Sequence, residues 1–554
     1  MALAVRQSVE HGGQHTNAVE DNEDENHRDN DGEVVVDSDD DGEIPTGPVR
    51  FKFSWRKLWK FMGPGWLMSL AYLDPGNLES DLQQGAYTGF TIVWVLWWAT
   101  VMGLILQELS ARLGVVTGMD LAQNIRKHFP RWLTWVVYVN MEAAVVAADI
   151  QEVVGSGIAI YILTKGKVAV WIGCIITGVD TFTFLAVHYL GVRYLEMLIC
   201  GLISTMTVCF FYNWADSGTD GGALGYGWAI PSIKTYAVTQ AVGTIGAVIM
   251  PHNLYLHSGL VQSRKVNRQN PHKVNDAIKY NLIESSLALL TSFFINLAIV
   301  ATNSANFYNP TCAEISSGGP LACLSPKTLA PGDVATHTCT LGNGDSGICA
   351  EIGLEKEGIA LAHGLGNYAM YIWALGLLAA GQASTMTCTY AGQVIMGGCL
   401  RIQLAPWKRV AFTRALALGP SIAVAAATVG NSELFNNINE YLNILQSVQL
   451  PFAMLPVLHL SSRPDIMGRF ASKPAVKIFN SVLAVIVMTT NVYLVITFVQ
   501  EFSPVGIVLS CLYGCLYAFF CFRMIWEDIK AMISKVTGSP LPPRTSEMSA
   551  SLRP

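Results

Sequence analysis

The sequence predicts an all-α polytopic membrane protein of about twelve spans, arranged as a 5+5 inverted repeat with broken helices 1 and 6. Three observations support this fold class. The 554 residues are 51% hydrophobic and only 14% charged, with a mean hydropathy of +0.37, which is too apolar for a soluble protein of this size. Apolar runs of about 20 residues, the length that crosses a bilayer, recur along the chain. Proline motifs interrupt two of these runs at corresponding positions of the two halves.

The N-terminal segment differs in composition from the rest of the chain. Its first 43 residues hold 14 acidic residues against only Arg6 and Arg28, and it is nearly free of aromatic residues. Such a segment cannot bury enough apolar surface to order itself. We therefore expect residues 1–50 to form a disordered cytosolic tail, with regulation or attraction of cations as its alternative role. A signal peptide is not expected, because the N-terminus is polar and acidic.

The membrane domain is expected over residues 51–530, followed by a short cytosolic tail at 531–554. Its candidate spans lie near residues 58–83, 88–111, 132–163, 168–190, 193–213, 238–258, 277–303, 364–396, 410–429, 437–460, 476–500 and 503–526. The first ten spans divide into two sets of five, and an odd number of spans inverts the second set relative to the first. Basic clusters follow the second, sixth, eighth and tenth spans, so the positive-inside rule places both termini in the cytosol.

The polar loop at 304–362 then faces the outside or the lumen of an organelle. It contains Cys312, Cys323, Cys339 and Cys349. In an oxidising compartment these cysteines predict two disulfides, in one of three pairings. The other eight cysteines lie in apolar segments and are interpreted as small hydrophobic residues. N-glycosylation of this loop is not expected, since it holds no acceptor motif.

The first break has the sequence Asp74-Pro75-Gly76-Asn77. Pro75 lacks a backbone donor and Gly76 permits positive φ, so carbonyl groups are freed and the flanking polar side chains can turn inward. Carboxylate, amide and carbonyl oxygens are ligands for divalent cations. A carboxylate within a membrane usually marks an ion or proton path. The alternative interpretation, an ordinary loop turn, is common in soluble proteins but not inside an apolar span.

The second break has the sequence Met250-Pro251-His252-Asn253, preceded by Ala247. Ala247 and Met250 are three residues apart and share one helical face. A thioether sulfur with oxygen ligands favours Mn(II), Fe(II), Co(II) or Cd(II) over Mg(II) and Ca(II), which prefer oxygen alone. A methionine in a membrane helix is more often core packing, but the position of Met250 at a proline break favours the ligand interpretation.

The third span contains three acidic residues, Glu142, Asp149 and Glu152, on one helix face. Acids aligned in an apolar span suggest a proton relay, whereas the alternative is an interfacial position or pairing with basic groups. Arg414, near the start of the ninth span, is a candidate partner. His252 is a candidate relay group because its intrinsic pKa lies near neutral pH.

Together these residues closely resemble the Nramp family, the natural resistance-associated macrophage proteins, which are proton-coupled transition-metal transporters. The resemblance extends from about Trp55 to Lys530. Both break motifs contribute to it, in the order and spacing of the family. Further similar segments lie at residues 107–118, 149–152, 379–393 and 446–452.

The resemblance implies a LeuT-like fold and import of Mn(II) or Fe(II), and also Cd(II) and Co(II), with a proton. It implies metal binding by Asp74, Asn77, the Ala247 carbonyl and Met250. On the tenth helix Asn443 aligns with a glutamine of bacterial members, and Gln446 is a nearby alternative ligand. The implied proton route comprises Asp74, Glu142, Asp149, Glu152, Arg414 and His252. Metals and protons are transported substrates, so neither a permanently bound cofactor nor an enzymatic activity is expected.

The sequence leaves alternatives open for the function and for the membrane in which the protein lies. The main alternative function is a non-transporting metal or signal sensor on an Nramp-like membrane domain, although the short segment after the last span counts against it. An amino-acid symporter would lack the methionine and the inward acids, and a channel is disfavoured because inverted repeats imply alternating access. Plasma, endosomal and vacuolar membranes all fit, the lipid bilayer is the expected partner, and nucleic acid is not. The sequence leaves the Mn/Fe preference and the oligomeric state undetermined.

Overall fold

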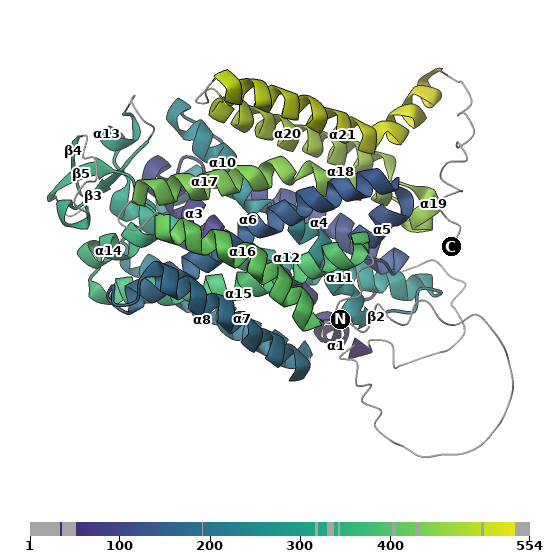
Figure 1. Ribbon diagram of the computed structural model, residues 1–554, viewed down its shortest axis with the longest axis horizontal. Helices are drawn as coiled ribbons and strands as arrows, with labels where there is room; N and C mark the ends of the chain where they lie inside the picture. The colour runs from purple at the N-terminus through teal and green to yellow at the C-terminus, as the bar shows by residue number, and fades with distance from the viewer. Residues whose placement is uncertain are drawn as a thin grey trace, which may run out of the picture.

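The computed structural model describes residues 34–35, 51–190, 192–315, 320–329, 337–341, 344–400, 406–427, 432–499 and 504–537. The described part is mostly helical, and its long helices run along the long axis of the molecule (Figure 1). Each of the twelve predicted spans coincides with a helix or with two helices around a break. The predicted all-α fold class is therefore confirmed.

The first repeat begins with a short helix and then a broken span. Its elements are α1 (Trp55–Phe61), α2 (Pro64–Ser69), the 3₁₀ turn η1 (Leu70–Tyr72), α3 (Pro75–Thr88), α4 (Val93–Thr117), α5 (Leu121–His128), α6 (Arg131–Leu163), α7 (Val170–Leu190) and α8 (Val192–Asp216). Helix α9 (Gly221–Ala229) connects this repeat to the next. The first predicted span thus consists of α2, η1 and α3.

The second repeat also begins with a broken span. Its elements are α10 (Val238–Val248), α11 (Pro251–Leu260), α12 (Pro271–Phe307), α15 (Asn367–Leu400), α16 (Pro406–Ala427), α17 (Ser432–Gln449) and α18 (Pro451–Ser461). After it come the short helix α19 (Pro464–Met467) and the two final spans, α20 (Pro474–Val499) and α21 (Pro504–Thr537). The sequence predicted one continuous tenth span, but a proline divides it into α17 and α18.

Seven described helical segments are long and apolar enough to cross a membrane. They belong to α4, α6, α8, α12, α17–α18, α20 and α21, and shorter apolar segments lie in α7 and α16. The halves of the two broken spans are too short to qualify singly, since α3 has 14 residues and α10 has 11. The breaks therefore lie within the bundle, where protein groups rather than lipid must satisfy the freed backbone.

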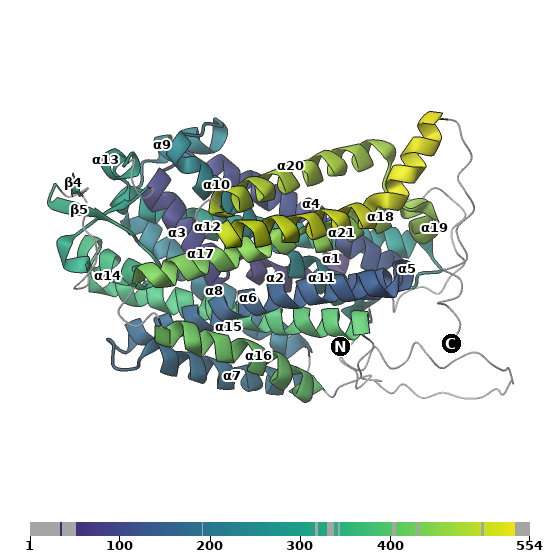
Figure 2. The same ribbon diagram turned by 45° about the horizontal axis from the view of Figure 1, so that its top comes forward.

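The segment after α12 forms a small lobe at one end of the molecule, opposite α5 and α19 in both ribbon views (Figures 1 and 2). It contains α13 (Pro310–Ala313), α14 (Leu354–Gly364) and an antiparallel sheet in the order β3 (Ala322–Leu324), β5 (Ser346–Ala350), β4 (Thr338–Thr340). The disulfides join Cys312 to Cys349 and Cys323 to Cys339. The structure thus selects one of the three pairings that the sequence left open.

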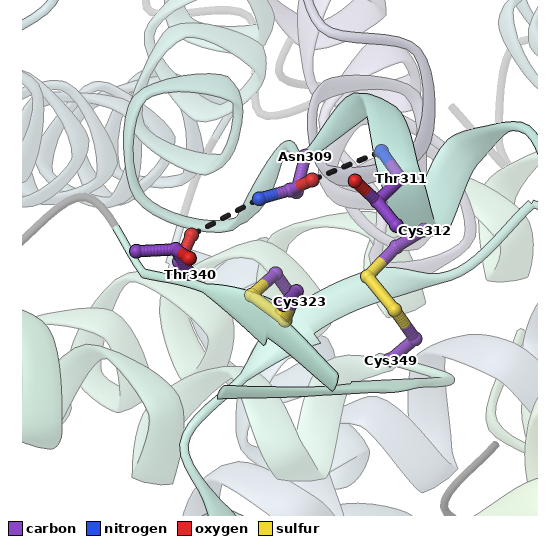
Figure 3. Close-up of a disulfide and its surroundings, with 7 residues drawn as sticks. Asn309, Thr311, Cys312, Cys323, Thr340 and Cys349 are labelled. Atoms are coloured by element: carbon purple, nitrogen blue, oxygen red, sulfur yellow. Dashed lines mark hydrogen bonds between the residues drawn. A yellow bond between two sulfur atoms is a disulfide. The ribbon is translucent and has the colours of Figure 1, made fainter. Parts of the chain in front are cut away.

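One side chain joins the two parts of this lobe (Figure 3). The amide of Asn309 donates to the Thr340 carbonyl at 3.0 Å, and its oxygen accepts from the Thr311 backbone N–H at 2.9 Å. Asn309 therefore caps α13 and holds it against β4.

The other end of the bundle holds the start of the membrane domain. The backbone N–H of Ser54 donates to the hydroxyl of Tyr280 on α12 at 2.7 Å, and that hydroxyl donates to the Lys52 carbonyl at 3.1 Å. Lys57 pairs with Asp276 at 2.8 Å. These contacts fasten the segment before α2 to the N-terminal part of α12.

The predicted tails lie largely outside the described residues. Of residues 1–50, only Val34–Val35 (β1) is described, and its backbone pairs in parallel with Arg264–Lys265 (β2). At the other end, α21 continues to Thr537. The disorder of residues 1–50 and the cytosolic location of both tails remain predictions.

Glu357 on α14 is buried in the lobe, and burial raises its pKa to about 8, although the nearby side chain of Asn303 opposes the shift. Unfolding returns this carboxyl to its ordinary, lower pKa, so folding favours the protonated form. We therefore expect thermal stability to fall as the pH rises from about 5 to 8, at about 1.4 kcal/mol per unit of pKa difference. Melting curves of purified protein at several pH values measure this slope.

Glu357→Gln should flatten the dependence, because the amide does not ionise. Glu355→Gln, on the same helix but only half-buried, is the matched control and should keep the wild-type slope. An unchanged slope in Glu357→Gln would show that this carboxyl does not control the stability of the lobe.

Candidate metal site

The first break is organised by Asp74, which caps the N-terminus of α3. Its carboxylate accepts a hydrogen bond from the Asn77 backbone N–H at 3.0 Å and another from the Asn77 side-chain amide at 2.7 Å. Pro75 occupies the first helical position, where a missing N–H costs nothing. Both polar side chains are buried, and within the described ranges the Asn77 side-chain oxygen has no hydrogen-bond partner. The break therefore presents a carboxylate and a free amide oxygen side by side.

Prolines in this bundle each deprive one carbonyl, four residues earlier, of its helical donor. For Pro75 that carbonyl belongs to Ala71, and the side chain of Asn253 from the second break donates to it at 3.3 Å. The next carbonyl, of Tyr72, accepts from Asn296 of α12 at 3.0 Å. The contact between Asn253 and Ala71 places the two breaks next to each other.

The kink between α17 and α18 follows the same rule. Pro451 cannot donate to the Ser447 carbonyl, which accepts instead from the side chain of Asn491 on α20 at 2.6 Å and from the Leu450 N–H at 3.1 Å. Leu450 keeps helical dihedral angles, so the helix bends here without opening.

The second break leaves a carbonyl without such a partner. Pro251 cannot donate to the Ala247 carbonyl, and the chain leaves the helix at Ile249 and Met250. Within the described part of the chain, no hydrogen bond from outside α10 reaches this carbonyl. Ala247 and Met250 are both buried. The second break can therefore offer a carbonyl oxygen and a thioether sulfur.

These groups form a suitable donor set for a transition metal. The set combines one carboxylate, one amide oxygen, one carbonyl and one thioether, and only the last distinguishes soft from hard cations. The carboxylate supplies negative charge where water is excluded. All four predicted ligands of the two breaks thus lie in a buried, polar region between neighbouring helix ends.

A buried ion pair joins two of the predicted proton-path residues. Arg414 of α16 contacts Asp149 of α6, and its guanidinium also donates to the Thr385 carbonyl at 2.5 Å and to the Thr389 hydroxyl at 2.7 Å. All of these groups are buried. Because both charges are compensated and further hydrogen-bonded, the pair is tolerated inside the bundle.

Cys388 of α15 connects two further predicted residues. Its thiol donates to Glu152 at 2.9 Å and lies 3.5 Å from a ring nitrogen of His252. The sequence interpretation of this cysteine as a small hydrophobic residue is therefore incomplete. It was missed because a cysteine in an apolar run carries no local signal of its contacts.

Glu142 lies apart from this group. It is two helical turns from Asp149, about 10 Å along the axis of α6, and neither of its carboxylate oxygens has a hydrogen-bond partner among the described residues. The structure brings together Asp149, Glu152, Arg414 and His252, but it does not bring Glu142 into contact with them.

Gln151 organises the tenth helix around the first break. Its amide donates to the side-chain oxygens of Asn439 at 2.7 Å and Asn443 at 2.8 Å, and its oxygen accepts from Gln446 at 2.7 Å. The same oxygen is so close to Gly76 that a Cβ there would lie only 2.9 Å from it. Both candidate ligands of the tenth helix are thus held by Gln151, whose role the sequence did not reveal.

Comparison with known proteins agrees with this geometry. A family model described as "Natural resistance-associated macrophage protein-like" matches residues 65–497. Metal transporter Nramp4 of Arabidopsis thaliana is 42% identical over 469 residues, which cover 84% of this chain and 85% of the relative. Natural resistance-associated macrophage protein 2 of Mus musculus is 41% identical over 497 residues, covering 89% and 85%. The first of these relatives is named as a metal transporter.

Solved structures support the same architecture. The crystal structure of a mutant manganese transporter from Eremococcus coleocola has a TM-score of 0.72 and 26% identity, covering 87% of this chain and 97% of that one. The transporter Mhp1 of the nucleobase-cation-symport-1 family matches with a TM-score of 0.50 and 12% identity, over 83% and 93% of the two chains. This second likeness concerns the fold alone, and it confirms the predicted LeuT-like architecture.

The ion pair between Asp149 and Arg414 makes a testable contribution to stability. Arg414→Gln leaves a buried carboxylate uncompensated, which should lower the free energy of unfolding by about 3–5 kcal/mol. Asp149→Asn in the same chain should restore much of this loss, because the remaining amides need no counter-charge. Thermal melts of the two single variants and the double variant measure the coupling, and strictly additive effects would show that the pair is not coupled.

Proposed function

The chain belongs to the natural resistance-associated macrophage protein (Nramp) family, and on that premise we propose that it is a proton-coupled symporter of divalent transition metals. Its substrates are Mn²⁺ and Fe²⁺, with Cd²⁺ and Co²⁺ as further substrates. It carries them toward the cytosol by alternating access. The donor set at the two breaks is the observation that supports this proposal most directly.

A metal ion would exchange part of its water shell for the Asp74 carboxylate, the free oxygen of Asn77, the Ala247 carbonyl and the Met250 sulfur. The thioether disfavours Mg²⁺ and Ca²⁺, which prefer oxygen ligands, and Mg²⁺ also gives up its water reluctantly. Asn443 and Gln446 are secondary candidates for the ligand set. In this structure both bind Gln151, so their recruitment would require that network to rearrange.

The proton route would use the groups assembled on α6. Glu152 contacts Cys388, which lies close to His252 of the second break. Asp149 would take up and release the proton, and the Arg414 guanidinium, which stays protonated and is hydrogen-bonded in place, would stabilise its carboxylate form. Glu142 would serve at a separate step, since it lies two turns away from this group.

Alternating access would involve the two broken spans moving against the remaining helices. The contacts of Tyr280 and Asp276 with the segment before α2 would hold one side closed. With the basic loops in the cytosol, that closed side is the cytosolic one, and the disulfide-bonded lobe faces outward or into a lumen. Plasma, endosomal and vacuolar membranes all satisfy this arrangement.

The sensor alternative shares the same metal site but lacks transport. It differs from the proposal in one observable, since a sensor binds metal without moving it across a bilayer. Proteoliposome uptake therefore separates the two functions.

We expect purified protein in proteoliposomes to take up Mn²⁺ and Fe²⁺ faster at an outside pH of about 5.5 than at about 7.5, because protons drive the coupled step. Asp74→Ala should abolish uptake. Met250→Ala should admit Mg²⁺, which the wild type excludes, because only oxygen ligands then remain. Radiolabelled or fluorescent metal flux measures all three results.

Glu314→Gln, which removes an exposed carboxylate of the outer lobe, is a control expected to match the wild type. Retained uptake in Asp74→Ala would contradict the proposed site. Metal binding without uptake under any gradient would favour the sensor.

The contacts of Tyr280 allow a test of whether this residue holds the cytosolic side closed. It stacks on Phe61 with ring centroids 5.4 Å apart and meets Phe51 edge-on at 5.1 Å. Each such pair contributes about 0.5–1.5 kcal/mol. Tyr280→Ala should therefore raise the population with this side open about tenfold, and amide hydrogen exchange in residues 51–65 should accelerate accordingly.

Tyr280→Phe keeps the ring contacts but loses both hydrogen bonds of the hydroxyl, so an intermediate effect is expected. If exchange in residues 51–65 were the same in all three proteins, Tyr280 would not fasten this segment.

A further inference from the structure

A second polar cavity lies beyond the two breaks, on the side of the disulfide-bonded lobe. Three helices line it, α3, α10 and α17, with residues that include Glu79, Gln83, Gln240, Glu440 and Asn443. Glu79 is four residues past Pro75, about 6 Å of helical rise from the first break. The cavity therefore lies directly above the metal site, on the proposed route of entry.

The floor of this cavity adjoins the metal site. Ser447 packs so tightly on Gly246 that a Cβ there would lie 1.9 Å from the serine hydroxyl oxygen, and Gly246 immediately precedes Ala247. The amide of Asn439 donates to Glu79 at 2.5 Å, while its oxygen accepts from Gln151. A chain of side-chain contacts thus links the cavity to the first break.

The lining contains polar atoms that the protein itself leaves unsatisfied. Ser80 and Ser447 line the cavity and are only 5% and 1% exposed, yet neither hydroxyl has a hydrogen-bond partner among the residues that the structure describes. A buried hydroxyl without a partner costs free energy. Two carboxylates, two unsatisfied hydroxyls and several amide oxygens therefore converge on one space.

We propose that this cavity is a second, transient cation site, in which a partly hydrated divalent metal ion binds before it reaches the breaks. The Glu79 and Glu440 carboxylates supply its charge. The hydroxyls of Ser80 and Ser447, with the amide of Gln83, ligate the ion or its waters. The inference rests on the proposed transport function only for its place on the route; binding itself can be tested without transport.

The donors of this site are all oxygens, unlike those at the breaks. An all-oxygen site does not discriminate against Mg²⁺, whereas a thioether does. The outer site therefore concentrates divalent cations of any kind, and the inner site selects among them. This division predicts that Mg²⁺ competes for the outer site even though it is not transported.

The test uses the full chain in detergent with two of the four inner ligands removed, in the double variant Asp74→Ala, Met250→Ala. Mn²⁺ binding is followed by the loss of the free-ion signal in electron paramagnetic resonance. About one equivalent should still bind, and excess Mg²⁺ should displace it. Adding Glu440→Gln, at an exposed position that folding tolerates, should weaken this binding at least tenfold, and Glu79→Gln should do the same.

Glu314→Gln in the same background removes an equal charge from the outer lobe and should leave binding unchanged. If Glu314→Gln and Glu440→Gln weakened Mn²⁺ binding equally, the effect would be a general electrostatic attraction of the cation, and the proposal would be overturned. Unchanged binding in both Glu79→Gln and Glu440→Gln would overturn it as well, as would the absence of any residual Mn²⁺ binding.

Uptake measured in the otherwise wild-type chain keeps the two proposals apart. Glu440→Gln should raise KM for Mn²⁺ several-fold and leave kcat unchanged. If the wild type bound Mn²⁺ at the outer site but transported none, the transport proposal would fail while the outer site stood. If transport proceeded with an unaltered KM in Glu440→Gln, only the outer site would be refuted.

Discussion

The structure depends on how a membrane-embedded chain satisfies carbonyl groups that prolines have deprived of their donors. In hydrocarbon, each unsatisfied backbone group costs several kcal/mol, so another part of the protein must supply a partner. Asn253 does this for the Ala71 carbonyl, and Asn491 does it for the Ser447 carbonyl. The Ala247 carbonyl is the exception, since Pro251 cannot donate to it. The same rule that holds the bundle together therefore identifies the carbonyl that remains available to a ligand.

A buried charge in the bundle likewise needs a partner from another helix. The Asp149 carboxylate and the Arg414 guanidinium neutralise each other, and two threonines take up further guanidinium donors. By contrast, the Asp74 carboxylate accepts hydrogen bonds from the backbone and side-chain N–H groups of Asn77, and no salt bridge to it is seen among the residues that the structure describes. A fixed but uncompensated carboxylate attracts a cation, whereas a compensated one stabilises the helices around it.

The outer cavity and the inner metal site of the proposed route differ in their ligand atoms. In the proposed route the outer cavity would offer oxygen ligands to a partly hydrated ion, while the inner site would add a sulfur. Gln151 lies between them and joins the tenth helix to the first break through Asn443 and Gln446. Its side chain is thus positioned to couple the occupation of one site to the shape of the other.

The sequence by itself determined the number and order of the spans and the positions of both breaks, because hydropathy and proline chemistry are local properties. It also placed the acids of α6 on one face, since helical spacing follows directly from residue numbers. Only the tertiary structure decided how Cys312, Cys323, Cys339 and Cys349 pair and that Cys388 reaches both Glu152 and His252. The same holds for the contacts of Gln151, and for the separation of Glu142 from the other acids. These features depend on which helices pack together across hundreds of residues, and no local pattern in one span specifies its neighbour.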